Sequence, residues 1–492
     1  MTKSKQPESN QTMCVISTSD IEEKMNYKKL TIFILLSVVI VLSSLEFGVF
    51  WDSVLFVSKM GIPLFENGFY NWQSIPLESD PGHPPFLASY MAVGWSIFGK
   101  SLAVSHWMML PFIFGLLWQL LAFVSFFVKE KIAQIAAFVL VVADPTLLSQ
   151  LVLVNFEVLQ LFFFFVAING ILYNKSWLKV LGLALLGLVS LRGMMLCAGV
   201  FLIDFFIHLY YYRKSLKSFF TIQMVLEYSF ASLPAAIYIV WRLMVKGWII
   251  SNPLQLWGSA WEYDSVADFF KNFARNIVVL GHQITDFGRV IPVLFVISTL
   301  FVKRKSLQWK PFLPVVITIL FSTSVIMIVS LLINNTMGHR YFIPVYLAVN
   351  LLAFMLIHQF KQYKLVYAGL LCALLFGNFI VYPDKFSQGW DSSLAHVPYW
   401  GLRRDAIKYL DENEIPIAET ATFFPNSTTI DNVELNGDLR SFPYFTGEQP
   451  YVLYSNVYNL TDEEFDLINK KYRIIKTFNK YNIRVELMKM RD

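Results

Sequence analysis

The chain has 492 residues, of which 56% are hydrophobic and only 15% are charged, and its formal net charge is +5. A water-soluble fold cannot bury this much apolar surface, so the composition excludes a soluble globular protein and predicts a polytopic α-helical membrane protein. The small positive charge does not indicate nucleic acid as a partner, because basic residues in such a protein are interpreted by their position between membrane spans.

The N-terminal region divides into a polar segment and an apolar one. Residues 1–28 lack apolar periodicity, which predicts a disordered cytoplasmic tail. The apolar run 30–50 follows two lysines and is long enough to cross the bilayer as a retained first helix. We place the transmembrane domain at 29–382, with long outer loops at 51–101 and 243–287.

Whether the segment 86–98 crosses the membrane determines on which side each later loop lies. It offers only about 14 apolar-rich residues, whereas a span needs about 17–25. We therefore predict an interfacial helix on the outer surface and place the second span at 102–128. Five later clusters of basic residues then fall in the cytoplasm, as the positive-inside tendency expects, and all five would lie outside if 86–98 crossed.

This topology predicts about eleven transmembrane helices, with the C-terminus outside. The run 177–212 is interrupted by Arg192-Gly193 and is interpreted as two tilted helices that meet near the outer face. The predicted spans are 30–50, 102–128, 132–150, 156–173, 177–191, 194–211, 219–242, 288–302, 311–333, 341–358 and 365–382.

Residues 383–492 have the composition of a small soluble domain. Their patterns predict helices at 399–413 and 461–471, a strand at 450–457 and a hairpin at 473–488. The region is therefore expected to be an extracytoplasmic α/β domain.

Candidate chemistry gathers in the first outer loop. Asp52 lies at the outer end of the first helix, and Asp80 and His83 close the loop. Each has an ordinary structural explanation, since Asp52 suits a hydrated helix end, Asp80 suits a turn and a lone histidine is usually a hydrogen-bonded polar group. Their grouping in one loop favours a catalytic site.

These features resemble the GT-C membrane glycosyltransferases, in particular the branch that contains protein O-mannosyltransferases and lipid A aminoarabinose transferases (glycosyltransferase family 39). The resemblance rests on Asp52, on the motif DxGHPP at 80–85 and on WSIFGKSLAVSHW at 95–107. Weaker similarities follow at Glu157, at Arg192-Gly193 and at 338–344, where Arg340-Tyr341 begins an RYxxP motif. The family carries an Asp-Glu pair where this chain has Asp52-Ser53.

The resemblance implies a GT-C fold and an inverting transfer of a sugar from a polyprenyl-phosphate donor to a hydroxyl acceptor on a protein, lipid or glycan. The expected location is the outer face of the bacterial inner membrane. Such a reaction needs a base and cations that stabilise the departing phosphate. The catalytic candidates are Asp52, Asp80 and His83; the phosphate-binding candidates are Arg192, His339 and Arg340; the substrate-binding candidates are Glu157 and Tyr341.

Ordinary explanations stay open for these residues as well. Arg192 and Arg340 also suit cations at helix ends, and Glu157 suits an acid in the first turn of a helix. Asp80 and His83 could orient Asp52 or the sugar, or hold the loop. No cofactor and no protein metal site are expected, and a divalent cation is compatible with the reaction without being required.

Two other classes of function remain as alternatives. A transporter or flippase of an amphiphilic substrate would show polar residues near the bilayer midplane and matched halves, whereas the ionisable residues here concentrate in outer loops. Ser53 in place of the second acid keeps an inactive GT-C-like scaffold in consideration. The sugar, the acceptor and the oligomeric state are left open.

The topology predicts that residues 51–101 lie wholly outside. Cysteines introduced at Ser74 and Ser96 should therefore react with an impermeant thiol reagent added to intact cells. Protection of the cysteine at Ser74, or outside labelling of one at Ser306, would contradict the eleven-span topology.

Overall fold

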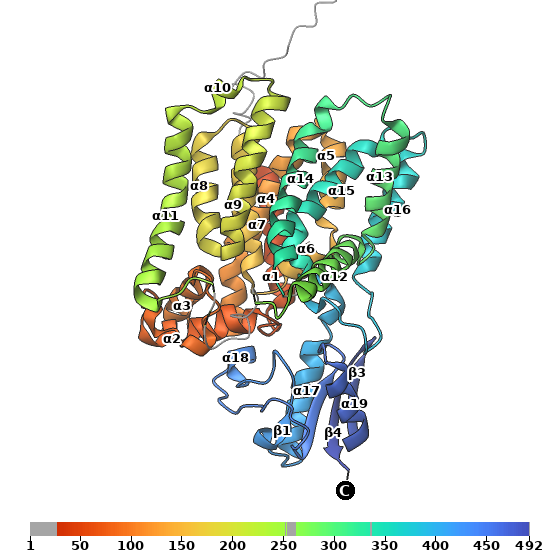
Figure 1. Ribbon diagram of the computed structural model, residues 1–492. Coiled ribbons are helices and arrows are strands. Elements are labelled where there is room, and N and C mark those ends of the chain that lie inside the picture. The colour runs from red at the N-terminus through yellow and green to blue at the C-terminus, as the bar shows by residue number, and fades with distance from the viewer. Residues whose placement is uncertain (1–26, 251, 253–261, 335–336, 492) are drawn as a thin grey trace, which may run out of the picture.

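The computed structural model describes residues 27–250, 252, 262–334 and 337–491 (Figure 1). Nearly all of the predicted tail at 1–28 lies outside the described residues. The chain forms a long helical bundle with a small sheet-containing domain at one end, and helices α2, α3 and α12 lie at that same end of the bundle. We call this the domain end.

The bundle contains sixteen α-helices among the described residues. They are α1 (Tyr27–Ser44), α2 (Met60–Asn67), α3 (Phe86–Phe98), α4 (Leu102–Phe127), α5 (Lys131–Val142), α6 (Pro145–Leu151), α7 (Phe156–Leu172), α8 (Ser176–Val189), α9 (Leu191–Phe206), α10 (Leu216–Phe219), α11 (Ile222–Lys246), α12 (Val266–Thr285), α13 (Val290–Lys303), α14 (Leu313–Leu332), α15 (Ile343–Ile357) and α16 (Tyr363–Gly377).

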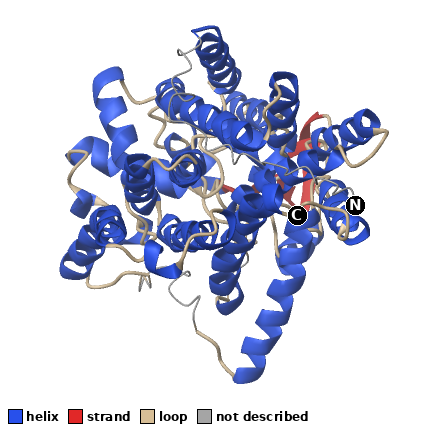
Figure 2. Cartoon of the chain, turned by 90° about the horizontal axis from the view of Figure 1, so that it is seen from above, coloured by secondary structure: helices blue, strands red, loops and turns tan. Residues whose placement is uncertain are grey.

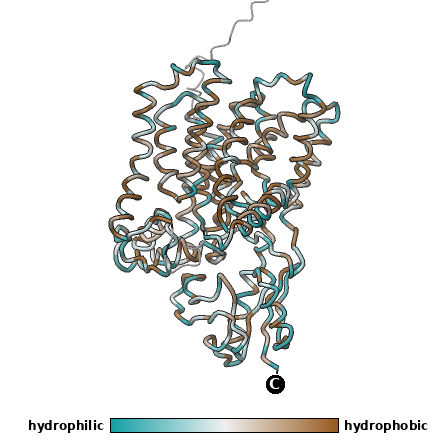
Figure 3. Tube along the Cα trace, in the orientation of Figure 1, coloured by the Kyte–Doolittle hydropathy of each residue, from teal (hydrophilic) through white to brown (hydrophobic). Residues whose placement is uncertain are grey.

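Hydrophobic residues run along the helices of the bundle, and the C-terminal domain is more hydrophilic (Figure 3). Among the described residues, five helices are long and apolar enough to cross a membrane, or up to seven if two bent helix pairs each count as one span. Other apolar helices, including α1, α7, α8 and α16, are shorter. The chain is an integral membrane protein, and the number of eleven crossings stays a prediction.

Helix α7 forms the centre of the bundle. Every one of its residues except Phe162 is buried, which agrees with a sequence that is apolar on all sides. It packs against α4 on one side and α8 on the other. The acidic residue in its first turn, Glu157, is therefore held at a fixed depth at one end of a rigid core helix.

Several elements agree closely with the sequence. The short helix predicted at 86–98 is α3, which starts after Pro85 and ends before Gly99. The run 177–212 forms two helices, α8 and α9, that meet at Ser190. The hydroxyl of Ser190 accepts a hydrogen bond from the Gly193 N–H and caps α9.

Two elements differ from the predictions. The span predicted at 132–150 is broken by 79° between α5 and α6, because Asp144 caps α6 and Pro145 occupies its first turn. The predicted outer loop at 243–287 contains the 20-residue helix α12, which is bent by 95° from α13. Charged residues interrupt the apolar positions of α12, so hydropathy alone did not reveal it.

The C-terminal domain is built on a four-stranded sheet in the order β1-β2-β4-β3. Strand β1 pairs with β2 in parallel, and the other pairs are antiparallel. Figure 2 shows that the strands occupy one small region of a mainly helical molecule. The elements are β1 (Thr420–Ala421), β2 (Tyr451–Ser455), β3 (Tyr472–Lys480), β4 (Ile483–Met490), α17 (Tyr399–Glu412), α18 (Asp431–Glu434) and α19 (Asp462–Lys471).

The predicted helices, strand and hairpin of this domain are confirmed. Helix α19 begins with a complete capping box, in which Thr461 and Glu464 each bond the other's backbone N–H. Strand β1 was missed because two residues carry no periodicity.

The C-terminal domain packs against the segment that follows α1. The Val49 N–H donates to the Val433 carbonyl at 2.8 Å, and the ring of Phe50 stacks on His396 at 4.9 Å. Lys100 forms an ion pair with the buried carboxylate of Asp431. The domain therefore fixes the chain on both sides of the first long loop.

Two glycines allow α16 to approach the corner between α12 and α13. A Cβ atom on Gly377 would overlap the carbonyl oxygen of Phe287, and one on Gly288 would overlap the carbonyl oxygen of Ala373. Gly288 also has a φ of +80°, which favours glycine. This contact holds the corner in place at the domain end.

The close approach predicts a large effect of one added methyl group. Gly377→Ala should lower the free energy of unfolding by about 1–3 kcal/mol, because the new methyl group would overlap the Phe287 backbone and could be accommodated only if a helix moved. Gly369→Ala, on the same helix with nothing within 4 Å of the added Cβ, should leave stability equal or slightly higher. Thermal unfolding of the purified variants in detergent measures this, and equal melting temperatures for both would contradict the packing.

Candidate active site

A single buried guanidinium gathers three carboxylates at the domain end. Arg340 lies in the short 3₁₀ helix η8 (His339–Phe342) that precedes α15, and its side chain is only 6% exposed. Its Nη1 pairs with Asp391, its Nη2 pairs with Asp52, and its Nε lies 3.2 Å from Oε1 of Glu157. One arginine thus contacts acids from three distant parts of the chain.

Local structure presents each acid to Arg340. Trp51 adopts a left-handed φ of 54°, which is unusual for a bulky residue, and Asp52 follows it two residues before the π-helix η2 (Val54–Lys59). Glu157 stands in the first turn of α7, and Asp391 lies in the 3₁₀ turn η9 (Trp390–Ser392). The Asp52 side chain is 27% exposed, against 1% for Glu157 and 6% for Asp391.

A second arginine joins the same acids. Arg192, in the first turn of α9, donates from Nη1 to Oε1 of Glu157 at 2.6 Å. Its guanidinium lies over the ring of Tyr341 at 3.5 Å from the ring centre, as in a cation–π contact. Glu157 therefore bridges the two arginines. We call this set, Asp52, Glu157, Arg192, Arg340 and Asp391, the arginine–carboxylate cluster.

His83 lies beside the cluster as a neutral ring. Its Nδ1 accepts a hydrogen bond from the Leu191 N–H at 3.1 Å, next to Arg192, and its ring meets Phe56 edge-on at 5.1 Å. Burial, followed by the charges of Arg192 and two further arginines, lowers the pKa of His83 to about 3. A ring that is neutral and bonded in this way holds the loop against α9 and is a poor base.

Asp80 is not brought to the cluster. Its carboxylate accepts from Arg242 at 2.9 Å and from the Gly82 N–H at 3.0 Å, and the residue is 2% exposed. Arg242 lies at the end of α11 and stacks on Trp248 at 3.9 Å. Asp80 therefore anchors the first long loop to α11 through Arg242, whereas Asp52 pairs with Arg340.

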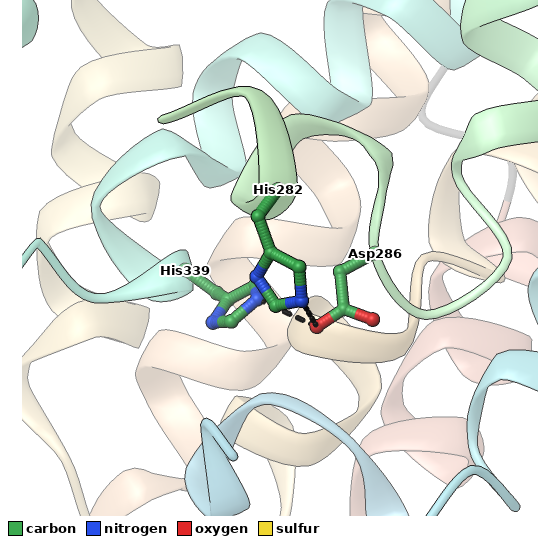
Figure 4. Close-up of side chains that lie close together, drawn as sticks. All are labelled: His282, Asp286 and His339. Carbon is green, nitrogen blue, oxygen red and sulfur yellow. Dashed lines mark hydrogen bonds and ion pairs between the residues drawn. The ribbon is translucent and has the colours of Figure 1, made fainter. Parts of the chain in front are cut away.

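His339 neighbours Arg340 in sequence but faces another site. Its Nε2 lies 2.9 Å from Oδ2 of Asp286, at the corner between α12 and α13, and His282 approaches the same oxygen (Figure 4). Of the three predicted phosphate-binding residues, Arg192 and Arg340 come together and His339 turns away.

The residue that the sequence analysis missed is Asp391. It lies in the connection between the bundle and the C-terminal domain, in a short turn where an aspartate is common. Asp391 comes close to Arg340 only through tertiary folding. The one feature of the local sequence that could have drawn attention to Asp391 is its place between an apolar helix and a soluble domain.

The cluster combines two kinds of chemistry. Its three carboxylates and two arginines leave a net charge of −1. The arginines can bind an anion through forked donors, and Asp52, the most exposed of the acids, can accept a proton from a bound molecule.

The fold around the cluster is the GT-C fold predicted from the sequence. Two crystal structures of ArnT from Cupriavidus metallidurans, a lipid A aminoarabinose transferase, are similar to this chain, one in the apo state and one bound to undecaprenyl phosphate. Each has a TM-score of 0.52 at 11% sequence identity, and the match covers 94% of this chain and 98% of ArnT. No protein-family model and no curated protein matches the sequence.

The low pKa of His83 predicts a pH-dependent stability. In the unfolded chain this histidine takes up a proton below about pH 6.5, but in the folded protein only near pH 3. Stability should therefore be fully present above about pH 6.5 and should fall as the pH drops below it, by up to about 1.4 kcal/mol per pH unit.

Melting temperatures between pH 7 and pH 4 test this. The loss should be steeper for the wild type than for His83→Gln, with His358→Gln, at an exposed position, as the control. Parallel profiles for the wild type and His83→Gln would contradict a buried neutral ring.

Proposed function

We propose that this protein is an inverting glycosyltransferase that moves a sugar from a polyprenyl-phosphate donor to a hydroxyl acceptor. The observation that carries the proposal is the convergence of Asp52, Arg192 and Arg340 at one end of a bundle with the fold of ArnT. One of the ArnT structures holds undecaprenyl phosphate. By this analogy the phosphate of a polyprenyl donor would occupy the region beside the two arginines.

The two arginines suit a lipid phosphate. The Arg192 guanidinium lies over the Tyr341 ring and is held there, and both Arg192 and Arg340 carry forks of donors that match a phosphate oxyanion. A phosphate that reached Arg340 would compete with Asp52 for the Nη2 group. Donor binding would thus release the Asp52 carboxylate.

Asp52 is the base in this proposal because it is the acid that solvent and an acceptor can reach. The acceptor oxygen attacks the anomeric carbon while the bond from that carbon to the phosphate oxygen breaks. Asp52 takes the hydroxyl proton, and the lipid phosphate leaves with the bonding electrons. Arg192 and Arg340 stabilise the charge that develops on the phosphate.

The remaining residues position these groups. Glu157 and Tyr341 fix Arg192 from two sides, and His83 fixes the loop that follows Asp52. Glu157 and Asp391 also place two further carboxylates beside Asp52, which favours an active enzyme over an inactive scaffold although residue 53 is serine. The reaction requires no cofactor, and we place the cluster on the outer face of a bacterial inner membrane.

The base assignment predicts that Asp52→Asn lowers the transfer rate by about 10²–10⁴-fold without weakening donor binding, because the amide keeps the shape, cannot take a proton and competes less with phosphate for Arg340. Transfer from a polyprenyl-phosphate sugar by purified protein in detergent measures the rate, and lipid binding is measured separately.

Asp391→Asn is the matched control, because it removes the same charge from the same guanidinium at a site that an acceptor cannot reach. Its loss should be clearly smaller than that of Asp52→Asn. Glu46→Gln, at an exposed position shortly before Asp52, should change nothing. Equal losses in Asp52→Asn and Asp391→Asn would remove Asp52 from the role of base.

A further inference from the structure

A second group of chemically active side chains lies at the corner between α12 and α13. His282 comes from the last turn of α12, Asp286 from the corner itself and His339 from the start of η8 (Figure 4). Oδ2 of Asp286 lies 2.9 Å from Nε2 of His339 and 3.8 Å from Nε2 of His282. Each residue offers one nitrogen or oxygen atom, and these atoms all lie within 4.8 Å of one another.

The two oxygens of Asp286 have different surroundings. Oδ1 accepts hydrogen bonds from the Phe287 N–H at 2.7 Å and from the hydroxyl of Tyr382. Oδ2 faces the two imidazoles. A carboxylate that is held through one oxygen and presents the other is the arrangement that outer hydrogen bonds give to metal ligands.

The rings of the histidines are restrained to different degrees. His339 is buried, and a Cβ added to Gly389 would come within 2.6 Å of its Nδ1, so the backbone just before η9 closes one side of the ring. The side chain of His282 is 50% exposed, and its Nε2 lies 3.4 Å from the hydroxyl of Tyr382. Asp286 and His339 are therefore held in place by hydrogen bonds and burial, whereas His282 is accessible to solvent.

We propose that His282, Asp286 and His339 bind a divalent transition-metal ion, with zinc as the ion that suits the ligands best. Zinc binds imidazole nitrogen and carboxylate oxygen at about 2.0–2.2 Å, so neighbouring ligand atoms in a tetrahedral site lie about 3.3 Å apart. Oδ2 of Asp286 lies 2.9 Å from Nε2 of His339 and 3.8 Å from Nε2 of His282, and these two distances bracket the value for a zinc site. Magnesium and calcium prefer sets made of oxygen alone.

The ion would join two elements that matter to the neighbouring cluster. It would link the α12–α13 corner to η8, the segment that also carries Arg340, and its fourth position would face the exposed side of His282. The proposal concerns binding of the ion and does not depend on the glycosyltransferase activity.

Zinc alone is the probe for the test. The full chain is purified in detergent through a tag without histidine, stripped with a chelator, and titrated with zinc by calorimetry and by equilibrium dialysis with elemental analysis. We expect one ion bound tightly per chain. His282→Ala and Asp286→Asn should each weaken binding at least tenfold, and His358→Ala, at the exposed position that follows α15, should not.

Folding and binding are separated by two further measurements. Because His282 is half-exposed, His282→Ala should melt near the stripped wild type, and zinc should raise the melting temperature of the wild type but not of this variant. Cobalt bound to the wild type should give the visible spectrum of a tetrahedral site, and His282→Ala should alter it. A wild type that binds no zinc at equivalence, or binding that is unchanged in both His282→Ala and Asp286→Asn, would overturn the proposal.

Discussion

The burial of Arg340 is the constraint on which the rest of this site depends. Removing a guanidinium from water costs several kcal/mol unless carboxylates and hydrogen bonds compensate, and loss of one partner from a buried pair typically costs about 3–5 kcal/mol. Arg340 is 6% exposed and meets three acids, from the end of the first helix, from the start of α7 and from the connection to the C-terminal domain. This fold buries the arginine by bringing these three segments together.

The need to pair the buried Arg340 also explains why Asp52 and Arg340 are paired in this structure. Asp52 is paired with Arg340, so the most accessible acid of the cluster and this arginine neutralise each other. In the proposed reaction, an incoming phosphate would replace one partner of Arg340 without leaving the guanidinium unpaired. Arg192 stays in position meanwhile, because Glu157 and Tyr341 hold it from α7 and η8. The short η8 segment thus serves two sites, with Arg340 turned to the acids and His339 turned to Asp286.

The fold was largely predictable from local patterns, and the site was predictable only in part. Composition indicated the membrane bundle, length identified α3 as a short helix, and the Thr461 capping box identified α19. Asp52 was selected from its place at the end of the first helix, Arg192 and Arg340 were selected from a resemblance to a family, and the structure brings these three together. Asp391 and Asp286 were missed because their partners lie 51 and 53 residues away, beyond any local pattern. Asp80 turned out to pair with Arg242, 162 residues further on, for the same reason.

The central claim is that the cluster transfers a sugar from a lipid phosphate, and release of free polyprenyl phosphate tests it most directly. Purified wild-type protein in detergent has no transmembrane gradient, so a transporter has no measurable activity there. The account predicts that polyprenyl-phosphate sugar, supplied with acceptors from the native cell envelope, is converted to free polyprenyl phosphate and glycosylated acceptor in equal amounts. Protein that binds the lipid-linked sugar but releases no polyprenyl phosphate with any acceptor fraction would contradict it.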